Sequence, residues 1–263
     1  MSKPDEVFGL ETIKRHTYGV ADLADQHPLD TPVPTCGTWT LAALAWHLIE
    51  VQRFWVHIIE QRPDATPASY TPPTPPDDER VLATQLRATC DRLVTLLEEA
   101  DPSEPAWSWS ENHTVGFTRR RQAHESFVHH VDAALAVNEP IPEVEAEFAS
   151  DGIDEVVQVM LCETPPWARF NATGGAVRLK ASDTGDLWTL LLGEVTGANP
   201  ETGQTFRLDG FALDRAAQAN AIITAPATQL DLWLWGRPAT GIITRGDTEL
   251  VQQFRKVLLE VTS

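Results

Sequence analysis

The sequence predicts an α+β protein of two domains, in which a four-helix bundle is followed by a smaller domain of mixed strands and helices. The 263-residue chain is longer than one small core needs. Four long amphipathic segments fill its first half, and short strand-like runs begin after residue 140. We therefore expect the bundle over residues 1–142 and the second domain over residues 143–263.

The first domain owes its predicted fold to four segments with helical periodicity. They cover approximately residues 5–26, 39–61, 79–100 and 118–138. Thr38 is placed to cap the second helix, and Asp77 and Asp78 precede the third, where acidic side chains favour a helix start. The proline-rich tract between these two helices cannot be helical. The segment Asn138-Glu139-Pro140 ends the fourth helix.

The second domain is expected to mix both kinds of element. A helix near residues 150–163 comes first. The strand-like runs after it read AVRLKAS, DLWTLLLG, QTFRLDGFAL and NAIITAP. The rest of the domain reads as the helix PATQLDLWLWGR, the short strand GIITRG and the closing helix DTELVQQFRKVLLEV.

Composition limits the classes of partner. The formal net charge is -18, with 38 acidic against 20 basic side chains, and 42% of residues are hydrophobic. Such a charge repels phosphate backbones and anionic membranes, so we expect neither a nucleic-acid nor a membrane partner; the small-molecule substrate that we also expect is implied by the family resemblance given below. The three scattered cysteines, without a signal peptide, favour a cytoplasmic protein. A monomer is the default expectation.

A chelating pair stands out in the fourth helix. Glu125 and His129 are four residues apart, so their side chains leave the same face one turn apart. They border the apolar stripe of this helix, where a charged carboxylate is costly unless it is paired. A carboxylate and an imidazole at this spacing suit Zn²⁺ or a similar divalent ion.

The string HESFVH begins like the zinc-protease motif H-E-x-x-H, but Val128 occupies the second histidine position. His124 and His129 are five residues apart, about 140° around the helix, and do not chelate together easily. We therefore interpret His124 as a flanking or outer-shell group.

His47 is the best candidate for a third ligand from another helix. It shares an apolar face with Leu44, Val51 and Phe54, and a polar group there requires a partner. The alternative is a hydrogen-bonded core histidine. The remaining histidines are weaker candidates: His57 lies near the same face, His16 could reach the interior, His130 points away, and His27 and His113 fall in loops.

Two segments of the sequence resemble a known family. PVPTCGTWTLAALAWHLIEVQRFW and RRRQAHESFVHHVDA are similar to motifs of the mycothiol-dependent maleylpyruvate isomerase-like family. That family has a DinB-like metal-binding four-helix bundle, followed by a sterol-carrier-like α/β domain. ITAPATQLDLWLWGR resembles part of the latter. The resemblance implies metal ligands at His47, Glu125 and His129.

The resemblance also implies an activity. A divalent metal, expected to be Zn²⁺ from the donor types, would leave a coordination position open for the thiol of mycothiol. The resulting thiolate could serve an isomerase or an S-transferase acting on a small electrophile. Two alternatives remain open: a non-catalytic metal- and ligand-binding protein, and a metal-dependent hydrolase that uses bound water.

Several residues outside the proposed ligand set are assigned further roles. Asp132 could orient a ligand imidazole, or it could be a surface carboxylate. Arg237 could bind an anionic substrate, although an arginine at a helix end is the simpler interpretation. Trp39, near the start of the second helix, could line a pocket, although aromatic side chains at helical spacing more often belong to the core. Cys36 could be a reactive thiol, but a buried, inert thiol is the expectation.

Overall fold

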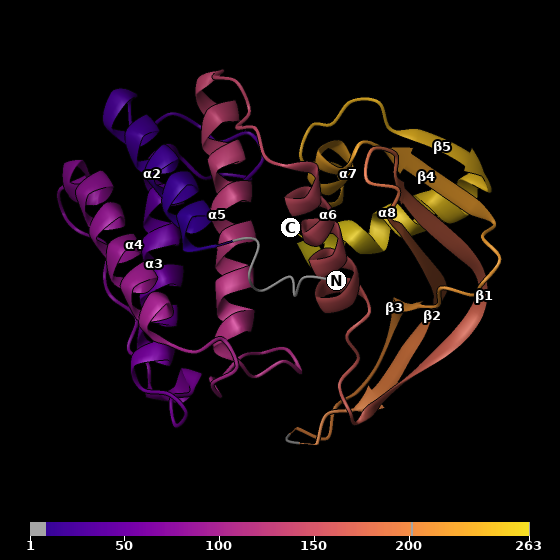
Figure 1. Cartoon of the computed structure of the whole chain (residues 1–263). Coiled ribbons are helices and arrows are strands. Elements are labelled where there is room, and N and C mark those ends of the chain that lie inside the picture. The colour runs from indigo at the N-terminus through magenta and orange to yellow at the C-terminus, as the bar shows by residue number, and fades with distance from the viewer. Residues whose placement is uncertain (1–8, 201, 263) are drawn as a thin grey trace. The chain divides into compact units, whose positions relative to one another are not determined.

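The structure is a computed structural model that describes residues 9–200 and 202–262 (Figure 1). The chain divides into two compact units, the first ending at Glu143 and the second beginning at Val144. The first unit is helical, and the second contains a five-stranded sheet with helices. The predicted α+β class with two domains is therefore confirmed.

Four long helices form the first unit. They are α2 (Leu10–Gln26), α3 (Leu41–Glu60), α4 (Leu82–Glu99) and α5 (Val115–Val137). α2 lies against α4 and α5, and α3 lies against the same two helices. The apolar stripes face inward, with Val20, Leu48 and Leu86 completely buried. The first part of the predicted 5–26 helix, residues 5–8, lies outside the described residues.

Threonine hydroxyls set the starts of α3 and α5, and two predicted starts were wrong for this reason. The N-cap of α3 is Thr40, whose side chain accepts a hydrogen bond from the Ala43 amide at 3.3 Å, so Thr38 does not cap it. α5 begins at residue 115 instead of 118, because Thr114 accepts from the Phe117 amide at 3.2 Å. Each hydroxyl satisfies an amide that the first helical turn leaves without a partner.

The proline-rich tract contains no α-helix but does contain one 3-10 turn, and α4 starts at residue 82 instead of 79, whereas α5 ends where the sequence predicts. Two short 3-10 helices, η1 (Pro67–Ser69) and η2 (Glu79–Val81), occur between α3 and α4. Asp78 caps η2 by accepting from the Arg80 amide. Asn138 ends α5 in the left-handed conformation, with φ of 60°, which asparagine tolerates better than most residues.

The second unit begins with a helix that starts earlier than predicted. α6 (Ala146–Glu155) continues into the π-helix η3 (Val156–Leu161). The later elements are β1 (Ala168–Ala181), β2 (Leu187–Ala198), β3 (Thr205–Leu213), β4 (Ala221–Ala225), α7 (Ala227–Leu234), β5 (Ile243–Gly246) and α8 (Thr248–Thr262). β1 starts eight residues before the predicted run, because antiparallel pairing with β2 extends it back to Ala168.

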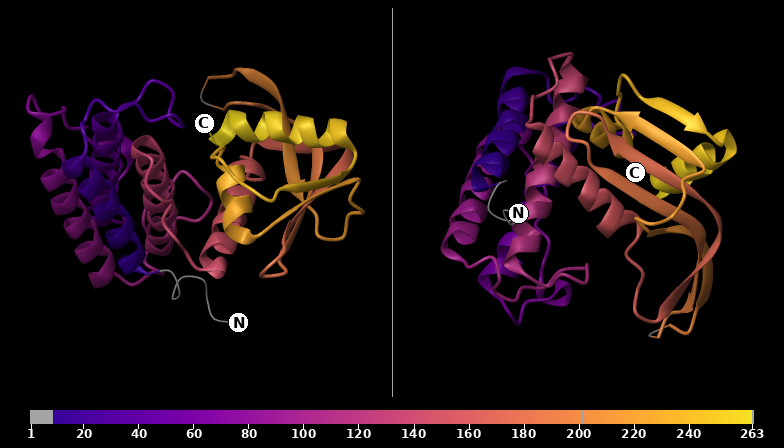
Figure 2. Two further views of the ribbon diagram at one scale, coloured as in Figure 1. Left: turned by 90° about the horizontal axis from the view of Figure 1, so that it is seen from above. Right: turned by 45° about the vertical axis from the view of Figure 1, so that its right-hand side comes forward.

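The sheet has the strand order β3-β2-β1-β4-β5, in which only the β1–β4 pair is parallel. α8 lies across one face of the sheet (Figure 2). Its Phe254 meets Phe211 of β3 edge to face, with ring centroids 5.1 Å apart. Both rings are buried, so this aromatic pair helps to join helix and sheet in the core of the second unit.

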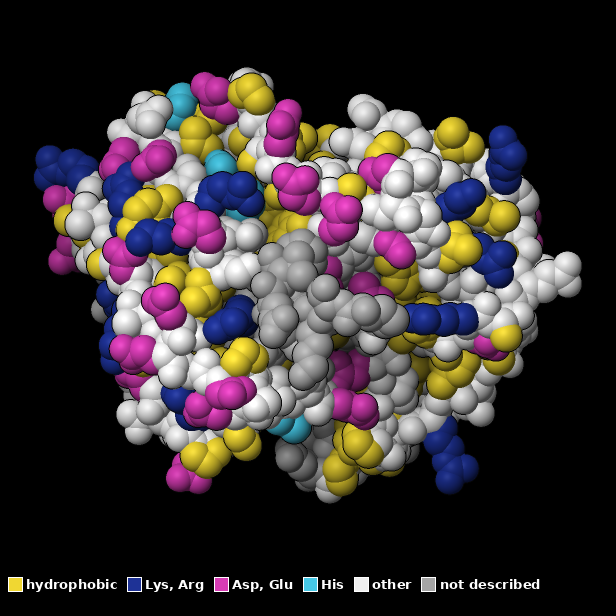
Figure 3. All heavy atoms as spheres, in the orientation of Figure 1, with side chains coloured by type: hydrophobic (Ala, Val, Ile, Leu, Met, Phe, Trp, Pro, Cys, Tyr) yellow, Lys and Arg dark blue, Asp and Glu magenta, His cyan; other side chains and the backbone are white. Residues whose placement is uncertain are grey.

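The surface reflects the acidic composition. Asp and Glu side chains are distributed over much of the face seen in Figure 3. In the described part of the chain, no helix combines the length and apolar character needed to cross a membrane.

α2 and α5 approach closely where the ring of His130 lies over Gly19. A Cβ atom at position 19 would lie 2.2–2.7 Å from atoms of this imidazole, which is closer than contacting atoms allow. Nδ1 of His130 is 3.1 Å from Nδ1 of His16, so the ring is also held from α2. The absence of a side chain at residue 19 therefore permits this helix contact.

Replacing Gly19 by alanine should lower the free energy of unfolding by about 1–2 kcal/mol, since the forced displacement of His130 outweighs the gain in helix propensity. Urea denaturation would measure the change. In a His130→Ala background the same substitution should instead be stabilising by up to about 1 kcal/mol, because the space is then free. An equal effect in both backgrounds would contradict this explanation.

Candidate metal centre

Three side chains from two helices meet near one point of the bundle. Nε2 of His47, on α3, lies 3.2 Å from Oε1 of Glu125. Nε2 of His129, one turn after Glu125 on α5, lies 3.3 Å from the same oxygen. One donor atom from each residue lies within 4.8 Å of the other two. The structure thus brings together the three residues that the sequence analysis selected as ligands.

The donor types fit a divalent metal. Two imidazoles and one carboxylate are a common set for zinc at a site with open coordination positions. The two imidazole rings are 4.9 Å apart and nearly perpendicular, at 75°. All three residues are partly or fully buried, so the cluster is formed by packed helices and not by mobile surface chains.

Electrostatic interactions keep Glu125 ionised. Burial raises the pKa of this carboxyl, but the His129 charge, hydrogen bonds from His129 and His47, and the nearby Arg121 hold its pKa well below the ordinary value. Arg121 lies one turn earlier on α5, with its guanidinium 3.1 Å from Oε2. Oε2 is therefore engaged by Arg121, whereas Oε1 faces the two histidines.

Asp132 is completely buried and fixes the outer side of His129. Its Oδ2 lies 3.0 Å from Nδ1 of His129, and this contact leaves Nε2 directed at Glu125. Burial lowers the pKa of His129, but the charge of Glu125 and the bond to Asp132 raise it well above the ordinary value. An imidazole held in this way through its other nitrogen is typical of metal ligands in proteins.

The loop before α3 holds Asp132 in turn. Thr35 donates its hydroxyl to Oδ1 at 2.6 Å, and the Cys36 thiol donates to Oδ2 at 3.4 Å. Cys36, His129 and Asp132 form a second group of side chains whose donor atoms could hold a metal. Cys36 is only partly buried, so the expectation of a buried thiol was wrong.

Trp39 lies over the two histidines and also packs against the apolar core of the bundle, which is the position the sequence favours. Its ring centroid is 4.8 Å from that of His47 and 6.4 Å from that of His129. Hydrogen bonds within the loop, from the Val33 amide to the Trp39 carbonyl and from the Trp39 amide to the Cys36 carbonyl, fix its position. In the sequence, this role is indicated only by the position of Trp39, directly before the N-cap of the helix that carries His47.

The other candidates lie elsewhere. His57 contacts the Ser69 hydroxyl at 2.9 Å, and His16 pairs with His130. His124 directly precedes Glu125 in the sequence and is buried. Its proposed role outside the ligand set stays a prediction. Arg237 belongs to the second unit, where its guanidinium donates to the Trp235 carbonyl at 2.5 Å, so its substrate role also stays a prediction.

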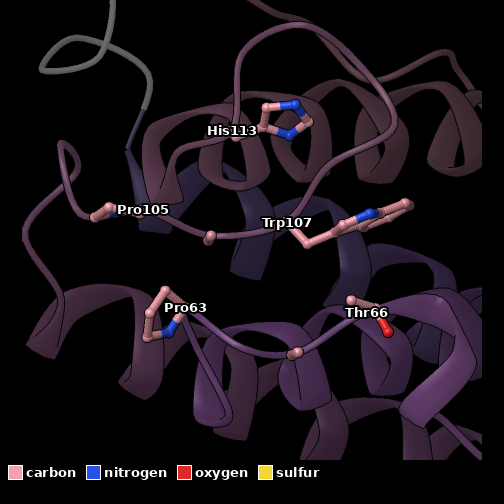
Figure 4. A pocket seen from close by; sticks show the side chains of 7 residues that line it. Pro63, Thr66, Pro105, Trp107 and His113 are labelled. Atoms are coloured by element: carbon pink, nitrogen blue, oxygen red, sulfur yellow. The ribbon is translucent and has the colours of Figure 1, made fainter.

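A separate cavity of about 210 Å³ lies beyond the end of α3 (Figure 4). Trp107 and His113 form part of its wall, with Pro63, Thr66 and Pro105. Trp107 also packs edge to face on Phe54, with centroids 5.7 Å apart. His47 lies thirteen residues, about 20 Å of helix, before the end of α3 at Glu60, and no residue of the histidine cluster lines this cavity, so the two are distinct.

Fold and site together define a four-helix-bundle protein with a His/Glu/His cluster, joined to an α+β unit. Residues 11–134 match the sequence model of the family described as the mycothiol maleylpyruvate isomerase N-terminal domain. This match includes all three residues of the cluster. The N-terminal part of the chain is therefore similar to that family, which supports the resemblance seen in the sequence.

Two solved structures share the fold. The crystal structure of the mycothiol-dependent maleylpyruvate isomerase is 14% identical, with a TM-score of 0.58, and the alignment covers 94% of this chain and 95% of that one. A histidine-to-alanine mutant of the enzyme gives 13% identity, the same coverage and the same TM-score. No curated protein matches the sequence. At this identity the structures establish the fold alone.

Proposed function

We propose that the first unit binds a divalent metal, preferentially Zn²⁺, through His47, Glu125 and His129. One observation carries this proposal: Oε1 of Glu125 lies within 3.3 Å of Nε2 of both histidines. An ionised carboxylate between two imidazoles on helices packed in a bundle is a donor set arranged before any ion arrives. We further propose that the chain uses this site to activate mycothiol, as an isomerase or S-transferase.

The metal would supply Lewis acidity, which makes a thiolate available at neutral pH from a thiol whose ordinary pKa is about 8.5. The protein contributes the positioning. Glu125 presents one oxygen while Arg121 holds the other, and Asp132 fixes the ring of His129. Trp39 supplies an apolar wall beside both imidazoles.

The choice of thiol and reaction is supported by the family match and by the name of the solved structures with the same fold. A thiolate that adds to an activated double bond permits rotation and elimination, which is an isomerisation. Displacement at an electrophilic carbon would be an S-transfer. Arg237 is our candidate for binding an anionic group of the substrate.

Calorimetric titration of mycothiol into the zinc-loaded protein tests this assignment. We expect saturable heat with the loaded protein and none with the metal-free protein. No heat at millimolar thiol would reject the thiol-dependent activity and favour a binding protein. Hydrolysis of ester or amide substrates without added thiol would favour the hydrolase alternative.

Replacing Asp132 by asparagine should weaken zinc binding by about 10–100-fold, because His129 loses the carboxylate that orients its ring. Competition with a zinc-binding dye would measure the dissociation constant. Thr35→Val should weaken binding in the same direction by a smaller factor, since Thr35 contacts Asp132 and not the imidazole of His129. Asp64→Asn, at an exposed position, serves as the control. Unchanged zinc affinity in Asp132→Asn would exclude a positioning role.

A further inference from the structure

The core of the bundle contains neutral polar side chains where apolar ones are expected. Five of them, which we call the core polar cluster, are 0–1% exposed. They are Thr17 of α2, Gln52 of α3, and Thr118, Gln122 and Ser126 of α5. None takes part in the histidine cluster, so the proposed metal site does not account for them.

Part of the cluster is connected by hydrogen bonds. Gln52 donates from Nε2 to the Thr17 hydroxyl at 2.9 Å, and Thr17 donates to the Ser126 hydroxyl at 3.1 Å. This chain links three helices. Oε1 of Gln52, both amide atoms of Gln122 and the Thr118 hydroxyl have no hydrogen-bond partner among the described protein atoms. Four buried polar atoms therefore lack protein partners.

Helix geometry places these atoms in one region. Thr118, Gln122 and Ser126 follow one another at four-residue intervals, so they share one side of α5. The bonds through Thr17 bring Gln52 to Ser126, which is one turn from Gln122. A buried amide or hydroxyl without a partner is costly, and native proteins satisfy such groups with protein or ordered water.

We propose that the core polar cluster is a hydration site, in which ordered internal water bonds to Gln52, Thr118 and Gln122. The atoms offer both donors and acceptors, and an internal water typically makes two to four such bonds. The absence of charge in the cluster disfavours an ion, and its complete enclosure favours water over part of a larger ligand. The site would bridge α3 and α5 in the bundle core.

Relaxation dispersion of water ¹⁷O, which counts water molecules held for nanoseconds or longer, tests this proposal on the whole protein. Replacing Gln122 by leucine should remove the signal of about one or two such waters, because the site loses its amide. Gln253→Leu, at an exposed position of α8, should leave the signal unchanged. Thr118→Val removes only a hydroxyl and should also lower the signal, which provides a test if the leucine variant does not fold.

A signal that neither variant changes would overturn the proposal. If the cluster holds no water, Gln122→Leu should have a melting temperature several degrees above that of the wild type, because the substitution removes an unsatisfied amide. That result would also overturn the proposal. A crystal structure with density for water on the Gln52 and Gln122 amides would support it. Density there for part of a bound thiol or substrate would overturn it in favour of a ligand subsite.

Discussion

Alanine in place of His47 should abolish stoichiometric zinc binding, whereas the wild-type protein should hold one equivalent. His47 is the only member of the cluster that α3 supplies, so its loss leaves two ligands on one helix. The affinity should fall by more than the ~10–100-fold that removal of an outer-shell partner costs. Elemental analysis after purification and dialysis would measure the metal content.

His57→Ala is the matched control, because this histidine lies on the same helix and contacts Ser69 instead of the cluster. Glu125→Gln should lose zinc as His47→Ala does, since the amide is a poor ligand without charge. Wild-type protein that holds no divalent ion, or His47→Ala that retains a full equivalent, would reject the proposed metal site.

Acidification from pH 7 to pH 5 should destabilise the bundle by roughly 2 kcal/mol for each of His16 and His130. Burial, the neighbouring imidazole and Arg15 lower the pKa of His16 to about 3. Burial also lowers that of His130 to about 4, with Asp22 opposing and Arg15 assisting the shift. Unfolded histidines bind protons below about pH 6.5, whereas these folded ones do not until far lower pH, so stability falls as the pH falls through this window.

Urea denaturation at a series of pH values would measure this loss. The double variant His16→Gln/His130→Gln should lose less stability between pH 7 and pH 5 than the wild type does. The carboxylates titrate in both proteins, so the difference between the two curves reports the histidines alone. Parallel curves would show that the pair does not control acid stability.

Periodicity was sufficient to predict the main elements of the bundle. The apolar stripes of α3 and α5 identified these helices, and four-residue spacing made Glu125 and His129 a pair. His47 could be placed on a core-facing stripe, but spacing alone could not show that this stripe meets Glu125. That step depended on the family resemblance, because helix pairing is a property of the tertiary fold.

Contacts made by loops and by close helix crossings were not predictable. Thr35 and Cys36 reach Asp132 across almost a hundred residues of sequence, and no local pattern encodes such a contact. The His16–His130 pair depends on Gly19, which reads in the sequence only as a weak helix former. A similar ambiguity affects the start of α3. Thr38 and Thr40 are both suitable N-cap residues and lie two positions apart, so the sequence alone does not show which of them caps the helix.

The positions of the three proposed ligands along the chain have a thermodynamic consequence. His47 and Glu125 are separated by 78 residues, and they approach within 3.2 Å. An ion bound to both would close a large loop and restrict the unfolded chain much as a disulfide does. Unlike a disulfide, this cross-link would strengthen with the free concentration of the ion. The folding equilibrium of the bundle would then follow the supply of metal in its surroundings.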